Sequence, residues 1–312
     1  VMWPIITDMT TGEAVPAPEV DMESSNFNGN FWSNWNRLSK GRGFVLTIAE
    51  KDVPLFLKQL KVMESSKNEL PFQIVSTGNE LSAESIAKIS ETAKETEQRV
   101  YLVDCSTVLD TNFANTYISF FQNKWVATLF NTFEEYILLD ADVVPFVGSD
   151  YFFDSPSYRE RGILLFKDRV MENEQTFQYC IEMLNEVEPS AQERRFIGSR
   201  LVFDSSLPFS SETSEEASVY YNFFKKLRLH HVDSGLVVVN KLEKLNGLLM
   251  SFMLNLDGKL QRCVYGDKEI FWLGQLYAGQ DYSINPVDGS IIGPVNEEPE
   301  NDDGHKSGMY YI

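Results

Sequence analysis

The first half of the chain alternates between short apolar runs and longer amphipathic stretches. Apolar runs bounded by polar or turn-forming residues predict strands at 43–48, 72–76, 100–104 and 136–139. Between them, apolar residues at helical spacing predict helices over 53–64, 82–98 and 113–133. Strands that alternate with helices in this way are typical of a Rossmann-like α/β fold with a largely parallel sheet.

The second half of the chain has a mixed pattern. Strands are expected at 162–166 and 236–240, and a helix over 175–186. Both halves together predict a single large α/β domain over 43–312, with a mixed sheet flanked by helices.

Three segments show neither the pattern of a strand nor that of a helix. Residues 1–42 contain three prolines and an Asn-rich aromatic stretch, and they predict an irregular N-terminal extension or stem remnant. The Ser- and Glu-rich segment 205–217 predicts a mobile loop. The acidic run 296–303 predicts a solvated loop rather than a binding site.

The strand at 136–139 is followed by two carboxylates one residue apart, Asp140 and Asp142. If the strand continues through them, both side chains point to the same face. Ligands of open α/β sheets bind at the carboxyl ends of strands, and carboxylates there can hold a hard divalent cation together with a pyrophosphate. Two other interpretations stay open at this stage. One is a solvated strand end, and the other is a haloacid-dehalogenase-like phosphatase that uses Asp140 as a covalent nucleophile.

Composition and charge narrow the classes of partner. The 312 residues include 22 Phe, 13 Tyr and 5 Trp, which is enough apolar material for a large core. The formal net charge of −19 argues against nucleic acid as a partner and against binding to anionic membrane surfaces. An anionic ligand would therefore be met locally, by a metal ion and a few Lys or Arg side chains. No apolar run reaches the length of about 18 residues that a membrane span needs.

The cysteines do not define a metal site. Cys105, Cys180 and Cys263 include no Cys-x-x-Cys pair, so a zinc site is not expected. One disulfide with one free thiol and three buried thiols are both compatible with this count. The first strand is not followed by Gly-x-Gly-x-x-Gly, so a dinucleotide cofactor is not supported.

Four later segments, in order after the Asp-x-Asp, carry a family resemblance. They are Phe-Lys-Asp-Arg at 166–169, Glu-Arg-Arg-Phe at 193–196, the His-His-Val-Asp-Ser-Gly stretch at 230–239, and Tyr-Gly-Asp-Lys-Glu at 265–274. Their order resembles the fungal Golgi α-mannosyltransferases, especially the α-1,3-mannosyltransferases that cap mannan branches. The similarity runs from about 43 to about 293. It outweighs the phosphatase interpretation, for which no follow-up Ser/Thr motif or acidic pair is recognisable.

The resemblance implies a nucleotide-diphosphosugar transferase fold of the GT-A type. It implies GDP-mannose as donor, Mn²⁺ as cofactor, and transfer with retention of the α configuration to a terminal α-mannoside of N- or O-linked glycans. It also implies a type II membrane protein of the Golgi lumen, whose anchor and stem precede Val1. A non-catalytic glycan-binding or scaffold subunit of a Golgi mannosyltransferase complex is a further alternative.

The same resemblance suggests roles for individual residues. Donor binding is expected from Thr47, Lys124, Asp140 and Asp142, and metal binding from Asp140, Asp142 and the late His305. Asp233 is the expected catalytic carboxylate, and acceptor binding is expected from Asp267, Lys268, Glu269 and Trp272. Each assignment competes with an ordinary structural role.

For Lys124 the structural alternative is a surface position on an amphipathic helix. For Asp233 it is a capped turn before a core strand. For the acidic residues at 267–269 it is the general preference for negative charge at a helix start.

Overall fold

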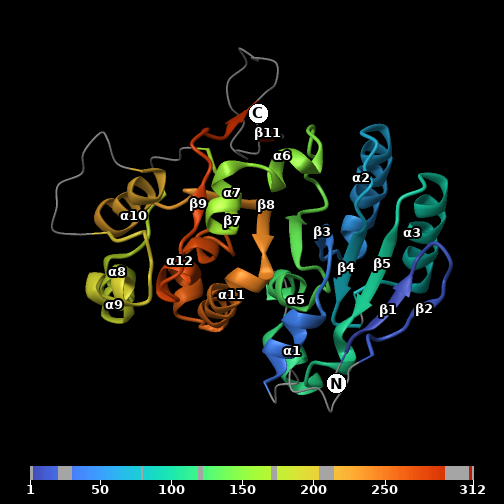
Figure 1. Cartoon of the computed structure of the whole chain (residues 1–312), viewed down its shortest axis with the longest axis horizontal. Coiled ribbons are helices and arrows are strands. Elements are labelled where there is room, and N and C mark those ends of the chain that lie inside the picture. The colour runs from blue at the N-terminus through green and yellow to red at the C-terminus, as the bar shows by residue number, and fades with distance from the viewer. Residues whose placement is uncertain are drawn as a thin grey trace, which may run out of the picture.

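The computed structural model describes residues 3–19, 30–78, 80–118, 122–169, 174–203, 214–291 and 309–310. Within these residues the chain forms a single domain, built on a mixed sheet that helices cover on both faces (Figure 1). The predicted α/β class is confirmed, and the arrangement is consistent with a GT-A-like fold. None of the helices in the described ranges is long and apolar enough to cross a membrane.

The main sheet has nine strands among the described residues, in the order β2-β1-β5-β4-β3-β6-β8-β7-β9. The strands are β1 (Ile5–Asp8), β2 (Ala14–Val15), β3 (Arg42–Leu46), β4 (Phe72–Ser76), β5 (Val100–Asp104), β6 (Glu135–Leu139), β7 (Ile163–Lys167), β8 (Val232–Asn240) and β9 (Ser283–Ile284). Strands β5, β4, β3 and β6 are parallel, and β8 is antiparallel to both β6 and β7. A separate two-stranded ladder joins β10 (Ser290–Ile291) to β11 (Met309–Tyr310).

The central strands are apolar on both faces because each face packs against helices. In β6, Tyr136 and Leu138 belong to one hydrophobic cluster, whereas Ile137 and Leu139 belong to the other. The first cluster is covered by α5 (Gln122–Phe130), α11 (Lys241–Leu256) and α12 (Ile270–Tyr277), among others. The second is covered by α2 (Val53–Ser65), α3 (Ala83–Glu95), α6 (Ser149–Phe153) and α7 (Pro156–Arg161). This two-sided burial explains why the strands form continuous apolar runs.

The remaining helices lie toward the ends of the domain. Helices α8 (Gln178–Val187), α9 (Ala191–Phe196) and α10 (Glu215–Lys226) gather at the end of the molecule away from α2 and α3 (Figure 1). A disulfide joins Cys180 of α8 to Cys263, while Cys105 is a buried free thiol. Of the two cysteine arrangements left open, the structure therefore has one disulfide and one free thiol.

The predicted element bounds need three corrections. Part of 1–42 is regular, because β1 pairs antiparallel with β5 and α1 (Phe31–Leu38) packs Trp35 into the core. The single helix expected over 113–133 is two helices, α4 (Thr111–Tyr117) and α5, because Ile118 adopts an extended conformation that ends α4. Strand β8 begins at Val232 rather than at 236, so Asp233 lies inside it.

Two predicted loops fall mostly outside the described residues. Of the segment 205–217, only the part from 214 onward is described, where the Ser214 hydroxyl caps the first turn of α10. The acidic run 296–303 lies outside the described residues.

Candidate active site

Strand pairing brings several of the predicted site residues together at one edge of the sheet. Leu139 at the end of β6 pairs with Leu236, and Phe166 near the end of β7 pairs with Asp233. The carboxyl ends of β6 and β7 therefore meet the beginning of β8 at one edge of the sheet. Thr47 follows β3, which is parallel to β6, so it lies at the same edge and is partly buried.

The two carboxylates of the Asp-x-Asp lie on a turn and not on the strand. Strand β6 ends at Leu139, and the Val143 amide donates to the Asp140 carbonyl at 3.1 Å. The expectation that alternation along a strand aligns Asp140 with Asp142 is therefore wrong, because the backbone turns at this point. The buried Gln59 amide holds the turn from α2, by donating to the carbonyls of Asp140 and Val143. Asp142 is exposed at the tip of this turn.

Lys124 is the centre of the charge arrangement at this edge. Its ammonium nitrogen lies 2.8 Å from Asp140 Oδ1 and 3.1 Å from Asp267 Oδ2, and it donates to the Ser234 carbonyl at 2.6 Å. The side chain is buried because α5 packs against the core, where Trp125 contacts the Phe271 ring. The alternative of a surface lysine is therefore wrong.

The pKa values follow from these contacts. Burial lowers the pKa of Lys124, but the charges of Asp140 and Asp267 outweigh burial, and the net result is a raised pKa. The pKa of Asp140 is raised, first because protein replaces the water around it and then by the negative charges of Asp267 and Asp142. The Lys124 ammonium opposes that increase. The site therefore combines a buried cation with a carboxylate, Asp140, whose side chain remains partly open to solvent.

Gly235 gives the turn room to approach β8. A Cβ atom added at Gly235 would lie 2.8 Å from Asp233 Oδ1 and 2.9 Å from Val143 Cγ2. The Asp140 amide donates to the Gly235 carbonyl at 2.9 Å, which joins the turn to the strand. A larger residue would separate the Asp-x-Asp turn from β8.

Asp233 has one oxygen fixed by the backbone and one facing a cation. Its Oδ1 accepts a hydrogen bond from the Gly235 amide at 2.6 Å, and its Oδ2 lies 3.5 Å from Lys268 Nζ. Asp233 is buried within β8 and is not in a turn before the strand. The structural alternative of a capped turn before the strand is therefore wrong, and the backbone of a core strand holds this carboxylate.

Asp267 lies beneath Lys124 rather than at an acceptor surface. Only 4% of the residue is exposed, and its Oδ1 accepts a hydrogen bond from the Ser234 hydroxyl at 2.9 Å. Together with the Lys124 contact, this arrangement engages both carboxylate oxygens. Asp267 therefore belongs with Asp140, because both carboxylates pair with Lys124.

Glu269 and Trp272 belong to the core. Both are 0% exposed, and Glu269 accepts hydrogen bonds from the Trp272 indole and from the His231 amide. The Trp272 ring packs edge-on against Phe223, so no face of it is free to stack on a sugar. The expected acceptor roles of these two residues are not compatible with this placement, because Glu269 caps, and Trp272 lies in, a helix whose residues are all buried.

Asp168 and His230 also belong to this edge of the sheet, although neither was singled out as a site residue. Asp168 follows β7 and is 3% exposed, and Lys268 donates to its Oδ2. His230 precedes β8 and has Nδ1 3.5 Å from Asp168 Oδ2. The signal available in the sequence was their position in two of the four segments that carry the family resemblance.

The residues present fit a divalent cation that is shared with a diphosphate. Oxygen ligands suit Mg²⁺ and Mn²⁺, and such ions are commonly held by one or two carboxylates together with substrate phosphates. Asp140 and the exposed Asp142 provide that set at the turn. No group of three or more His, Cys, Asp or Glu side chains in the described ranges is placed to hold a metal without further ligands. His305, the expected third ligand, lies outside the described residues.

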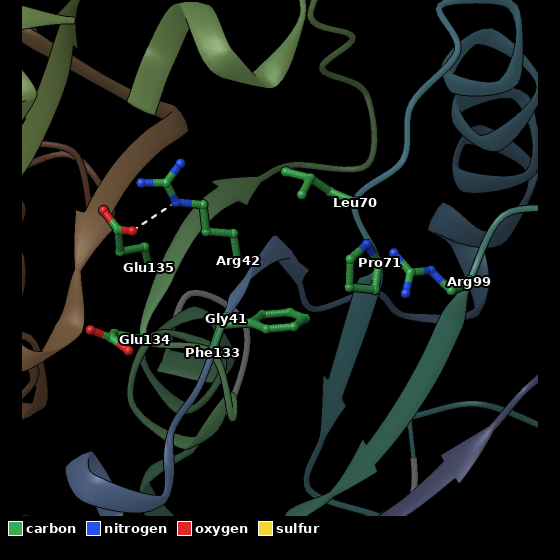
Figure 2. A pocket seen from close by; sticks show the side chains of 8 residues that line it. All are labelled: Gly41, Arg42, Leu70, Pro71, Arg99, Phe133, Glu134 and Glu135. Atoms are coloured by element: carbon green, nitrogen blue, oxygen red, sulfur yellow. Dashed lines mark hydrogen bonds and ion pairs between the residues drawn. The ribbon is translucent and has the colours of Figure 1, made fainter. Parts of the chain in front are cut away.

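An open pocket with a volume of about 590 Å³ lies at the amino ends of the strands, opposite the edge that carries Asp140. Figure 2 shows the residues that line it, among them Gly41, Arg42, Pro71 and Arg99, at or near the amino ends of β3, β4 and β5. Arg42 is already paired with Glu135 at 2.7 Å. Because ligands of open α/β sheets bind at the carboxyl ends of strands, we assign the candidate site to the edge with Asp140.

A family model described as "Mannosyltransferase putative" matches residues 41–311. The chain is 99% identical over 312 residues to alpha-1,3-mannosyltransferase MNT3 of Saccharomyces cerevisiae, a match that covers 100% of the chain and 50% of that protein. It is 31% identical over 275 residues to alpha-1,3-mannosyltransferase MNT2 of the same organism, covering 85% of the chain and 48% of that protein.

A third relative is more distant. The chain is 27% identical over 284 residues to alpha-1,3-mannosyltransferase MNN1 of Saccharomyces cerevisiae, covering 84% of the chain and 37% of that protein. The chain thus spans half or less of the length of these relatives. The matches favour the glycosyltransferase interpretation of the Asp-x-Asp over the phosphatase one.

Proposed function

Because the chain belongs to this mannosyltransferase family, we propose that it transfers a mannosyl group from an activated donor to a glycan acceptor. The named relatives are alpha-1,3-mannosyltransferases, and we propose the same α-1,3 linkage here. The proposed reaction has three further details, namely GDP-mannose as donor, retention of the α configuration, and a terminal α-mannoside of an N- or O-linked glycan as acceptor. They rest on the family resemblance.

One observation supports donor binding at this edge most strongly. Lys124 is buried and paired with both Asp140 and Asp267, and the exposed Asp142 lies two residues after Asp140 on the same turn. A buried ammonium with a raised pKa stays positive at neutral pH, so it offsets negative charge close to the turn. Asp140 and Asp267 together carry more negative charge than Lys124 offsets, so a metal ion at the turn has to supply the remaining positive charge that accepts a nucleoside diphosphate.

Mn²⁺ is the proposed cofactor, held by Asp142 and Asp140 at the turn. When bound, it would supply positive charge to the departing diphosphate. Lys124 orients Asp140 through their ion pair, and Gln59 fixes the turn backbone. Thr47 borders the donor site from the end of β3.

Asp233 is the proposed catalytic carboxylate at the start of β8. Its Oδ1 is held by a backbone amide, which fixes the carboxylate close to the turn that binds the donor. Two routes to retention fit a rigid carboxylate here. One is a covalent glycosyl intermediate on Asp233, and the other is same-face attack through an ion pair that Asp233 stabilises.

The proposed location is the Golgi lumen, as a type II membrane protein. Support for this location comes from the family resemblance alone.

The decisive experiment is a transfer assay. The protein is incubated with GDP-mannose, Mn²⁺ and mannobiose, and GDP release and trisaccharide formation are measured, with the linkage determined by NMR. An α-1,3-linked trisaccharide supports the proposal. Hydrolysis of p-nitrophenyl phosphate without transfer would instead support the phosphatase alternative. Mannobiose binding without turnover would support the glycan-binding or scaffold alternative.

A further inference from the structure

The ammonium group of Lys268 lies between two carboxylates of different burial. It donates to Asp168 Oδ2 and lies 3.5 Å from Asp233 Oδ2. The Asp168 side chain is 1% exposed and the Asp233 side chain 12% exposed. Lys268 is thus anchored on its buried side by Asp168 and presents its charge to Asp233 on the other side. The acceptor role expected of Lys268 stays a prediction, because its side chain is partly exposed.

Asp168 has no access to a substrate, but several contacts fix it in place. Its Oδ1 accepts a hydrogen bond from the Arg169 amide at 2.8 Å, and its own amide donates to the His231 carbonyl at 3.2 Å. An unpaired charge at so buried a position would be costly, which is why this carboxylate holds Lys268 firmly. Any effect of Asp168 on chemistry must therefore pass through Lys268.

His230 supports this arrangement from a backbone conformation that is rare outside glycine. Its φ is +60°, in the left-handed region, and its ring lies between two acidic side chains. Nε2 is 2.6 Å from Glu174 Oε2, and Nδ1 is 3.5 Å from Asp168 Oδ2. Strained backbone of this kind persists where the surrounding structure holds it, and it is concentrated at functional sites.

We infer that Asp168 is a positioning residue, which together with His230 holds Lys268 against Asp233 and so fixes the orientation of the Asp233 carboxylate. The Gly235 amide restrains only Oδ1 of Asp233, and the Lys268 charge restrains the other oxygen. The inference rests on the proposed function, because it assigns Asp233 to the chemistry.

The test is Asp168→Asn, which keeps the shape of the side chain and removes its charge. We expect kcat for mannosyl transfer to fall by up to about a hundredfold, since misplacing a catalytic group by about 1 Å has that effect. The KM for GDP-mannose should stay unchanged, because Lys124 and Asp142 are not touched. Asp154→Asn is the matched control, since Asp154 pairs with Arg159 at the surface, and its kcat should equal that of the wild type.

A double-mutant cycle separates positioning from general damage. Asp168→Asn combined with Lys268→Met should lose no more kcat than Lys268→Met alone, because both changes remove one interaction. If the losses multiply, or if Asp168→Asn keeps the wild-type kcat, the inference is overturned. Should Asp168→Asn fail to fold, Lys268→Met still has to show the fall in kcat with unchanged donor KM, since Lys268 is partly exposed.

The same cycle measured on urea unfolding keeps this inference distinct from the proposed function. Coupling between Asp168 and Lys268 in stability depends on their contact and not on turnover. A wild-type protein with no transfer activity would contradict the proposed function, whereas absent coupling in an active enzyme would contradict the positioning role.

Discussion

Lys124 Nζ lies 2.8 Å from Asp140 Oδ1, and this ion pair joins a helix of the core to the strand end that carries the Asp-x-Asp. The same ammonium group reaches Asp267 Oδ2 at 3.1 Å. One buried cation therefore serves two carboxylates from distant parts of the chain. It has both a structural role and an electrostatic role at the edge where we propose that the donor binds.

Replacing Lys124 with Met should therefore damage stability as well as function. The change leaves Asp267 buried without its cation, and breaking a buried pair in this way costs about 3–5 kcal/mol. Urea unfolding measures the loss of free energy. Lys88→Met is the matched control, because Lys88 forms an exposed pair with Glu84, and its unfolding curve should match that of the wild type. A Lys124→Met protein as stable as the control would show that the pair contributes nothing to the fold.

The metal prediction concerns Asp142. Asp142→Ala should abolish the Mn²⁺-dependent part of GDP-mannose binding and leave the melting temperature unchanged, because this carboxylate is exposed on a turn. Calorimetry with and without Mn²⁺ measures the difference. Asp150→Ala removes another exposed carboxylate, in the first turn of α6, and should bind as the wild type does. Metal-dependent affinity that survives in Asp142→Ala would remove Asp142 from the site.

Nucleotide preference can be tested by thermal shift. A ligand that binds only the native state raises the melting temperature, and we expect GDP with Mn²⁺ to do so more than UDP with Mn²⁺. This prediction rests on the family to which the chain belongs. An equal or larger shift with UDP would point to a different donor sugar nucleotide.

The fold and the edge that holds the site were accessible from sequence because they depend on local patterns. Apolar runs of about five residues marked the central strands, and the carboxyl end of β6 follows from its position in that pattern. The start of β8 was missed because Asp233, Ser234 and Gly235 are polar or small. Inside the protein these residues are satisfied by Lys268, Asp267 and the backbone, so they can be part of a buried strand.

The partners of the charged residues could not be predicted in the same way. Lys268 and Asp168 are 100 positions apart, and no periodicity connects them. Trp272 was expected to stack on a sugar because an aromatic ring after a charged stretch suits that role. Its burial depends on Phe223 and Tyr282, which tertiary packing brings to it. Such contacts are specified by the whole fold and not by a segment.

His230 predicts a defined pH dependence of stability. The pKa of His230 is raised, chiefly by Asp168 and also by Glu174. A raised pKa in the folded state gives stability that is complete below the unfolded value of about 6.5, and that is lost as pH rises through the folded value. His230→Gln should therefore lower the free energy of unfolding at pH below about 6.5, with the difference shrinking at higher pH. Urea unfolding across this window measures it, and a difference that does not vary with pH would contradict the assignment.

The final prediction separates Asp233 from Asp267, which lie close together but have different surroundings. Asp233 is held by the Gly235 amide within a core strand, so Asp233→Asn should lower kcat by about two orders of magnitude or more while donor affinity is kept. Asp267 pairs with Lys124, so Asp267→Asn should weaken donor binding and lower stability, because Lys124 loses one of its two carboxylates. Steady-state kinetics with GDP-mannose varied at saturating mannobiose distinguish the two, with unfolding curves measured in parallel.

Normal turnover by Asp233→Asn would exclude Asp233 as the catalytic carboxylate. If Asp267→Asn instead raised only the KM for mannobiose, Asp267 would contact the acceptor despite its burial in the unliganded protein.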